Sequence, residues 1–312
     1  YAAVNLAYDD ALRVRVVALM SSAWVLPALL GPALAGLLAE TLGWRVVFWG
    51  LVPLLALVAL LALGAVARLR PTGTGRARPD LLWALLLVVG AGVFLAALST
   101  LGWVLVFGIA AGVLAFLALA RLLPAGTLRL EPGLPAVVAA RGLFYAAFIG
   151  VETFLALMLS EVHGFSSAVA GLVIASGAIS WTLASWLQDR LETRYGPAAR
   201  HRRVRLGAAL MGLGLAAQVL ALYSPLLPLL ITLGGWTLAG FGVGLAHSSS
   251  SVLAFARAPR GGEGRVSASL QLADQFGSAI STGAGGALFA LALAQGLELR
   301  TGVLAAFGFN LL

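Results

Sequence analysis

Two carboxylates, Glu152 and Asp274, lie inside long apolar runs of the sequence. Glu152 follows Arg141 by 11 residues, and Asp274 follows Arg265 by nine. At about 1.5 Å per helical residue, both acids would lie near mid-membrane if these runs are spanning helices. A charge there costs at least about 2.5–3.5 kcal/mol, so such residues usually face a cavity and bind an ion or a proton. We predict proton exchange at Asp274 and Glu152; the alternative for each is a protonated acid bonded to a neighbouring helix.

Asp274 belongs to a polar stripe whose members recur at steps of four, three, four and three residues. That spacing places them on one face of a helix. The stripe comprises Ser267, Gln271, Asp274, Ser278 and Ser281. Lipid offers no hydrogen bonds, so a polar face must contact water, protein or a substrate. The stripe therefore predicts a substrate pathway, with a polar seam between two helices as the alternative.

His247 follows three glycines, Gly240, Gly242 and Gly244, in another apolar run. The glycines permit close helix packing, and a nucleotide-binding loop is excluded because no strand precedes them. His247 could line the pathway and relay protons, and a structural hydrogen bond is the alternative. The three histidines of the chain are too scattered to share a metal ion, so we expect neither a metal nor a cofactor.

Asp189 and Arg190 begin the most polar stretch of the chain, which we expect to be a loop over residues 188–205. Its charges either orient the protein in the membrane or form a cytoplasmic gate that holds one conformation through ion pairs. Exposed ion pairs contribute only about 0–1 kcal/mol each, so both interpretations stay open.

Membrane-spanning helices are the elements that must position these side chains. Of the 312 residues, 61% are hydrophobic and only 10% are charged, too few to cover a soluble domain. Each apolar run of about 20 residues can cross a bilayer, and continuous runs favour helices over barrel strands. The expected spans are 15–38, 45–67, 81–99, 102–120, 136–159, 166–187, 204–223, 226–250, 266–294 and 302–312.

The arginines fall almost entirely on one side of this arrangement. Only Arg45 and Arg300 lie in loops of the other side, and no arginine is expected deep in a span. The positive-inside rule places the Arg-rich loops in the cytoplasm of a multi-pass protein of the cell's inner (plasma) membrane. The net charge of +8 is thereby explained without nucleic acid. The absence of a deep arginine favours a cationic or neutral substrate.

Four segments carry motifs of a known family. The segment 31–36, with Gly31, Pro32 and Gly36, is similar to the antiporter motif in the fifth helix of the major facilitator superfamily. The resemblance is to its fourteen-helix drug:proton antiporter branch. The entry to the sixth helix of that branch is similar to segment 42–45, and its second cytoplasmic loop motif is similar to segment 185–190. Its penultimate helix is similar to segment 265–286.

The resemblance implies an all-α polytopic membrane protein with two helical bundles joined by two extra helices. Residues 1–68 would end the N-terminal bundle, 69–130 would hold linker loops and the two additional helices, and 131–312 would form the C-terminal bundle with its last helix cut. The chain is then expected to be N-terminally truncated by about four helices. The implied function is proton-coupled efflux of a lipophilic cationic or neutral small molecule by a multidrug-type antiporter.

The partners implied are that substrate, protons and the lipid bilayer, with no nucleic acid, and we expect a monomer. A metabolite importer or uniporter of the same superfamily is the main alternative. A membrane-embedded enzyme would need a nucleophile beside a base, and the chain has no Cys and no cluster of His with acids at a helix end. We therefore expect no enzyme. A sensor that binds a ligand without moving it is a further alternative.

Overall fold

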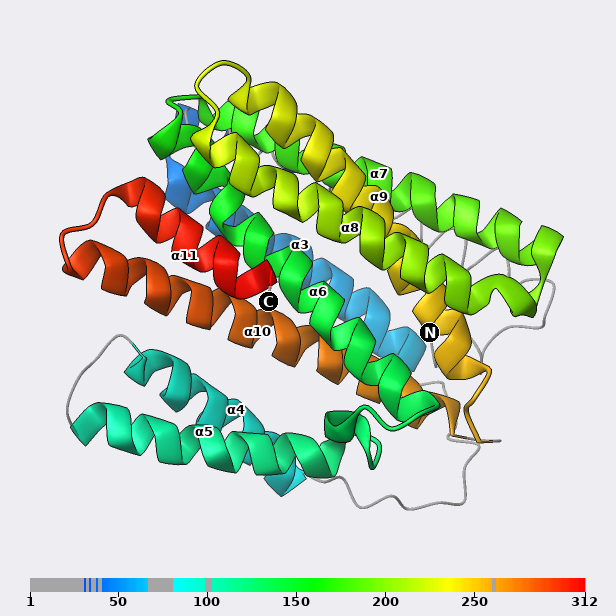
Figure 1. Cartoon of the computed structure of the whole chain (residues 1–312). Coiled ribbons are helices and arrows are strands. Elements are labelled where there is room, and N and C mark those ends of the chain that lie inside the picture. Colours follow the sequence, from blue (N-terminus) through cyan, green and yellow to red (C-terminus); the bar gives the residue numbers. More distant parts are fainter. Residues whose placement is uncertain are drawn as a thin grey trace.

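The computed structural model describes residues 31, 34, 38, 41–66, 81–98, 103–259 and 262–311. This part of the chain is helical and contains no strand (Figure 1). Seven of its helices are long and apolar enough to cross a membrane. The α-helices are α3 (Trp44–Val66), α4 (Leu81–Ala97), α5 (Trp103–Leu122), α6 (Leu134–Leu157), α7 (Ser167–Tyr195), α8 (Arg200–Tyr223), α9 (Pro228–Phe255), α10 (Glu263–Ala294) and α11 (Leu299–Leu311).

Short helical turns complete the described chain. A 3₁₀ turn, η1 (Thr127–Arg129), precedes α6, a π-helical turn, η2 (Met158–Val162), continues it, and a second 3₁₀ turn, η3 (Pro197–Ala199), links α7 to α8. The all-helical polytopic fold is thus confirmed. Of the first expected span, 15–38, only residues 31, 34 and 38 are described, and all three are helical.

The predicted loop over residues 188–205 is wrong. α7 continues to Tyr195 and ends at Gly196, which adopts φ +63°, and α8 begins at Arg200. Glutamine, glutamate and arginine are good helix formers, so the helix continues past the apolar run into the polar region. Hydropathy detects the part of a helix that crosses hydrocarbon, and it misses such extensions.

Two apolar clusters hold α4 to α11 together. One joins α6, α7, α8, α9 and α11 around buried side chains that include Phe148, Trp236 and Phe307. The second joins α4 and α5 to α6, α9 and α10, with Leu87 and Leu119 among its buried members. The α4–α5 pair lies beside α10 (Figure 1) and contacts it mainly through α4.

Glycines set the spacing between α8 and α9. A Cβ atom added at Gly214 of α8 would lie 2.4 Å from the backbone oxygen of Gly235, and one added at Gly242 of α9 would lie 2.3 Å from the nitrogen of Met211. The backbone atoms that meet each added Cβ atom cannot move away unless α8 and α9 separate. This close approach is the small-residue packing that membrane helices use in place of a hydrophobic driving force.

Gly214→Ala should therefore destabilise the protein, whereas the same change two residues earlier should not. A Cβ atom at Gly212 meets no heavy atom within 4 Å, so Gly212→Ala should be neutral or stabilising by up to about 1 kcal/mol through helix propensity. Overpacking at Gly214 should cost about 1–3 kcal/mol. Thermal unfolding followed by tryptophan fluorescence compares the two variants; equal midpoints would contradict the close packing.

Candidate functional site

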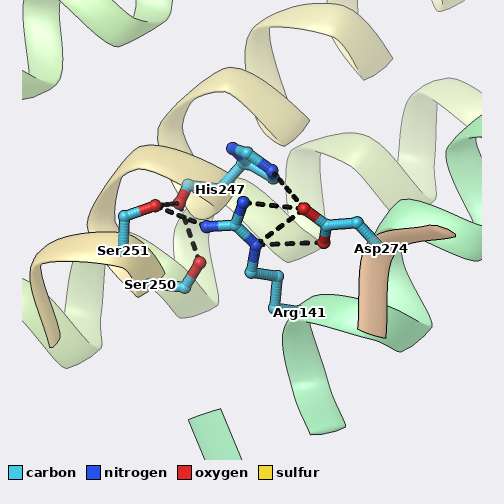
Figure 2. Close-up of polar contacts among 5 residues, drawn as sticks. All are labelled: Arg141, His247, Ser250, Ser251 and Asp274. Atoms are coloured by element: carbon cyan, nitrogen blue, oxygen red, sulfur yellow. Dashed lines mark hydrogen bonds and ion pairs between the residues drawn. The ribbon is translucent and has the colours of Figure 1, made fainter. Parts of the chain in front are cut away.

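Arg141 of α6 and Asp274 of α10 form a buried ion pair (Figure 2). Arg141 Nε donates to Asp274 Oδ1 at 3.0 Å, and the Nη2 nitrogen donates to Oδ2 at 2.7 Å. The two side chains are only 7% and 4% exposed. Such two-point pairing is strong and fixes the geometry of both groups. Arg141 lies in the second turn of α6, which begins at Leu134, and so falls near the start of the expected span 136–159.

Helix α9 supplies the remaining members of this cluster. His247 Nε2 lies 3.3 Å from Asp274 Oδ2, and Arg141 donates through Nη1 to Ser251 Oγ. Ser250 and Ser251 both donate to the backbone carbonyl of His247, as Figure 2 shows. The network therefore ties three helices together at one point. No serine hydroxyl among these five residues bonds the imidazole ring, so they form no pair of nucleophile and base.

Glycines beside the ion pair explain why α6 and α10 can approach so closely. A Cβ atom at Gly142 would lie 3.1 Å from the backbone oxygen of Ala273, and one at Gly277 would lie 2.6 Å from the oxygen of Gly142. Gly142 follows Arg141, and Ala273 precedes Asp274. The same local packing that joins the two helices thus brings the two charges into contact.

The rest of the polar stripe on α10 divides between the α6 seam and a more open surface. Ser281 is buried, donates to the carbonyl of Ala146 at 2.6 Å and bonds Asn310 of α11. Ser278 and Ser267 are half-buried, and Gln271 is exposed. The contacts of Asp274 and Ser281 are those of an interhelical seam, while a pathway lined by the stripe stays a prediction.

Glu152 lies about three turns, or 16 Å, beyond Arg141 along α6, so the two acids do not share one site. The side chain is half-buried, and within the described parts of the chain no hydrogen bond or ion pair reaches its carboxylate. Beyond it, Ala156 of α6 and Ser160 of η2 line a cavity of about 220 Å³ shared with α7. Among the described residues the carboxylate of Asp274 is thus paired with Arg141 and His247, while that of Glu152 has no such partner, and proton exchange at Glu152 stays a prediction.

An aromatic cluster adjoins the Arg141–Asp274 pair, and no pattern in the sequence predicted this cluster. Tyr145 of α6 and Trp181 of α7 meet edge to face with ring centroids 6.1 Å apart, and Trp181 lies 5.3 Å from the His247 ring. Phe148 stacks on Trp236 at 4.5 Å. Tyr145 and Trp181 are half-buried, whereas the stacked pair is buried. These rings come from three helices, so no local pattern could group them.

Asp189 and Arg190, the predicted gate residues, are both exposed near the end of α7. The ion pairs of this region use other residues: Glu192 binds Arg200 and the buried Arg203, which join the end of α7 to the start of α8. A gating role for Asp189 and Arg190 stays a prediction.

The antiporter motif is described only in part. Gly31 is helical, and a Cβ atom there would meet nothing within 4 Å of the described atoms. Pro32 and Gly36 lie outside the described residues. The role of this motif therefore stays a prediction.

Comparison with known proteins identifies the family. The chain matches the family model of the Major Facilitator Superfamily over residues 1–282. It is similar to the Multidrug resistance protein Stp of Mycobacterium tuberculosis, in strains CDC 1551 / Oshkosh and ATCC 25618 / H37Rv, with 27% identity over 283 residues in each. The alignment covers 86% of this chain and 51% of the relative, so the chain spans about half the relative's length.

The superfamily consists of membrane transporters, which are not enzymes. The architecture agrees, because seven of the described helices are long and apolar enough to cross a membrane. The family match covers most of the 312 residues. The chain is therefore a multi-pass membrane protein that belongs to the major facilitator superfamily.

Proposed function

We propose that this protein exports a lipophilic cationic or neutral small molecule in exchange for protons. The similarity to a protein named for multidrug resistance supports efflux as the direction and lipophilic compounds as the substrates. The observation that supports the proton coupling is Glu152, a carboxyl within α6 that has no partner among the described residues and lies on a helix that also lines a cavity. Intramembrane acids that lack a fixed partner are the usual carriers of protons in transporters.

Glu152 and Asp274 then have different roles. The carboxylate of Asp274 is fully engaged by Arg141 and His247, so proton binding there would require the cluster to break. We assign Asp274 to hold α6, α9 and α10 together as one unit during alternating access, with the proton exchanged at Glu152. His247 then orients Asp274, and a proton relay through its ring is not needed.

The substrate preference follows from the aromatic rings beside the Arg141–Asp274 cluster. The half-buried rings of Tyr145 and Trp181 offer aromatic faces, which attract lipophilic cations when water is excluded. The buried charge of Arg141 would repel a cation if it were alone. Because Asp274 compensates this charge, a preference for cationic or neutral compounds is compatible with the buried arginine.

The remaining features complete the proposal. We assign α4 and α5 as the two extra helices of a fourteen-helix transporter, between an N-terminal bundle ending near residue 68 and a C-terminal bundle from residue 131. The protein would work as a monomer in the plasma membrane. Gly31, Pro32 and Gly36 would form the antiporter motif, and the exposed charges at the end of α7 would face the cytoplasm and contribute to the gate.

Counterflow in proteoliposomes tests this function. The full-length protein is reconstituted, and uptake of ethidium or tetraphenylphosphonium is followed with and without an imposed pH gradient. Each pH unit of gradient supplies about 1.4 kcal/mol per proton exchanged, so the gradient should drive accumulation well above equilibrium. Accumulation that ignores the pH gradient would contradict proton coupling, and uptake of metabolites but not of these cations would favour an importer.

A further inference from the structure

A groove with apolar walls runs along α10 on the side opposite to Asp274. It is formed between α4, α5 and α10 and has a volume of about 400 Å³. Its lining includes Ala91 and Phe94 of α4, Gly112, Val113 and Phe116 of α5, and Phe276 of α10. Phe276 follows Asp274 by two residues, which places the two side chains on nearly opposite faces of the helix. The groove is therefore separate from the Arg141–Asp274 cluster.

The groove lies at the level of the hydrocarbon core. On α5 it extends from Ile109 to Phe116, the middle of a helix that runs from Trp103 to Leu122. Two of its walls, Ile109 and Val113, are more than half exposed, so the groove opens toward the bilayer. The side chains that line an apolar groove open to hydrocarbon lose van der Waals contacts on the open side unless acyl chains of the bilayer fill the groove. Its natural occupant is an acyl chain.

A charge marks the end of the groove where such a lipid would place its headgroup. Arg121 of α5 lies with its guanidinium carbon 5.6 Å from the centre of the Trp83 ring of α4. Trp83 precedes Phe94 by 11 residues, so both lie on one face of α4, about 16 Å apart along the axis. That distance matches half of the hydrocarbon core, about 15 Å. Tryptophan favours this interfacial depth, and arginine attracts anionic headgroups there.

We propose that this surface binds an anionic phospholipid, with one acyl chain in the groove and the phosphate at Arg121. The lipid would fill the gap between the α4–α5 pair and α10 and so hold the pair against the bundle. Lipid binding at this site depends on neither Glu152 nor the Arg141–Asp274 cluster. The lipid proposal can therefore be tested independently of the proposed transport.

Photo-crosslinking in nanodiscs tests the headgroup preference. The full-length protein is exposed to phosphatidylglycerol or phosphatidylcholine carrying the same diazirine-labelled acyl chain, and mass spectrometry locates the labelled residues. Phosphatidylglycerol should label Phe94, Phe116 or Phe276 about fivefold more than phosphatidylcholine, the preference expected from one arginine near the membrane surface. Arg121→Gln should remove that preference.

Two matched controls sharpen the test. Arg45 lies over Trp44 of α3 in a similar arrangement away from the groove, so Arg45→Gln should keep the preference for phosphatidylglycerol. Ala91→Trp fills the groove and should abolish labelling of its walls, whereas Val88→Trp, at an exposed position of the same helix, should not. Equal labelling by the two lipids in the unmodified protein, or undiminished labelling of the groove in Ala91→Trp, would overturn the proposal. Arg121 is exposed, so Arg121→Gln stays informative if Ala91→Trp does not fold.

Discussion

Arg141→Gln should destabilise the protein more than the removal of both charges of its ion pair. The single change leaves Asp274 buried at 3% exposure without its guanidinium partner, and breaking a buried pair in this way costs about 3–5 kcal/mol. Asp274→Asn should have a similar effect, because it leaves the arginine uncompensated. The double variant removes both charges and should recover most of the lost stability. Unfolding midpoints from tryptophan fluorescence, measured in one detergent, give the comparison.

An exposed arginine provides the control for this cycle. Arg190 lies near the end of α7 with an exposed side chain, so Arg190→Gln should shift the unfolding midpoint little. The interaction free energy is the difference between the double variant and the sum of the single variants. If the free-energy changes of the two single variants add up to that of the double variant, the ion pair does not hold α6 to α10. The assignment of Asp274 as a positioning residue then fails.

Glu152→Gln should abolish accumulation driven by a pH gradient while substrate exchange continues. The amide keeps the size of the side chain and removes its ability to carry a proton, so uphill movement of ethidium should fall to the level of protein-free vesicles. Counterflow needs no net proton movement and should persist. Glu161→Gln, at an exposed position nine residues further along the same helical segment, should retain full accumulation.

Asp274→Asn distinguishes the two acids in the same assay. If Asp274 only positions helices, the Asp274→Asn variant should still couple transport to the pH gradient once its activity is normalised to the amount of folded protein. Loss of coupling in normalised Asp274→Asn, with coupling intact in Glu152→Gln, would reverse the roles assigned to these two residues.

The sequence predicted the helices well because hydrocarbon imposes a length and a composition that can be counted. The spans from residue 45 onward agree with α3 to α11, apart from the ends that continue into the polar region. Composition does not report where a helix stops once it leaves the bilayer. For that reason the loop expected at 188–205 is instead the end of α7, a short turn and the start of α8.

The candidate site was harder to predict because its members are far apart in the sequence. Asp274 stood out as a charge in an apolar run, but its partner Arg141 lies 133 residues away, near the start of the expected span 136–159. Charge alone could not say which acid was paired. Only packing shows that glycines bring α6 against α10 at Asp274, while Glu152 stays unpaired among the described residues.

The central claim, that Glu152 exchanges a proton for the transported compound, is tested most directly by proton release. Purified full-length protein in weakly buffered detergent solution receives tetraphenylphosphonium while a pH indicator records the free proton concentration. The wild-type protein and Glu161→Gln should release protons on binding, and Glu152→Gln should release none. Equal proton release from Glu152→Gln and the wild-type protein would contradict it.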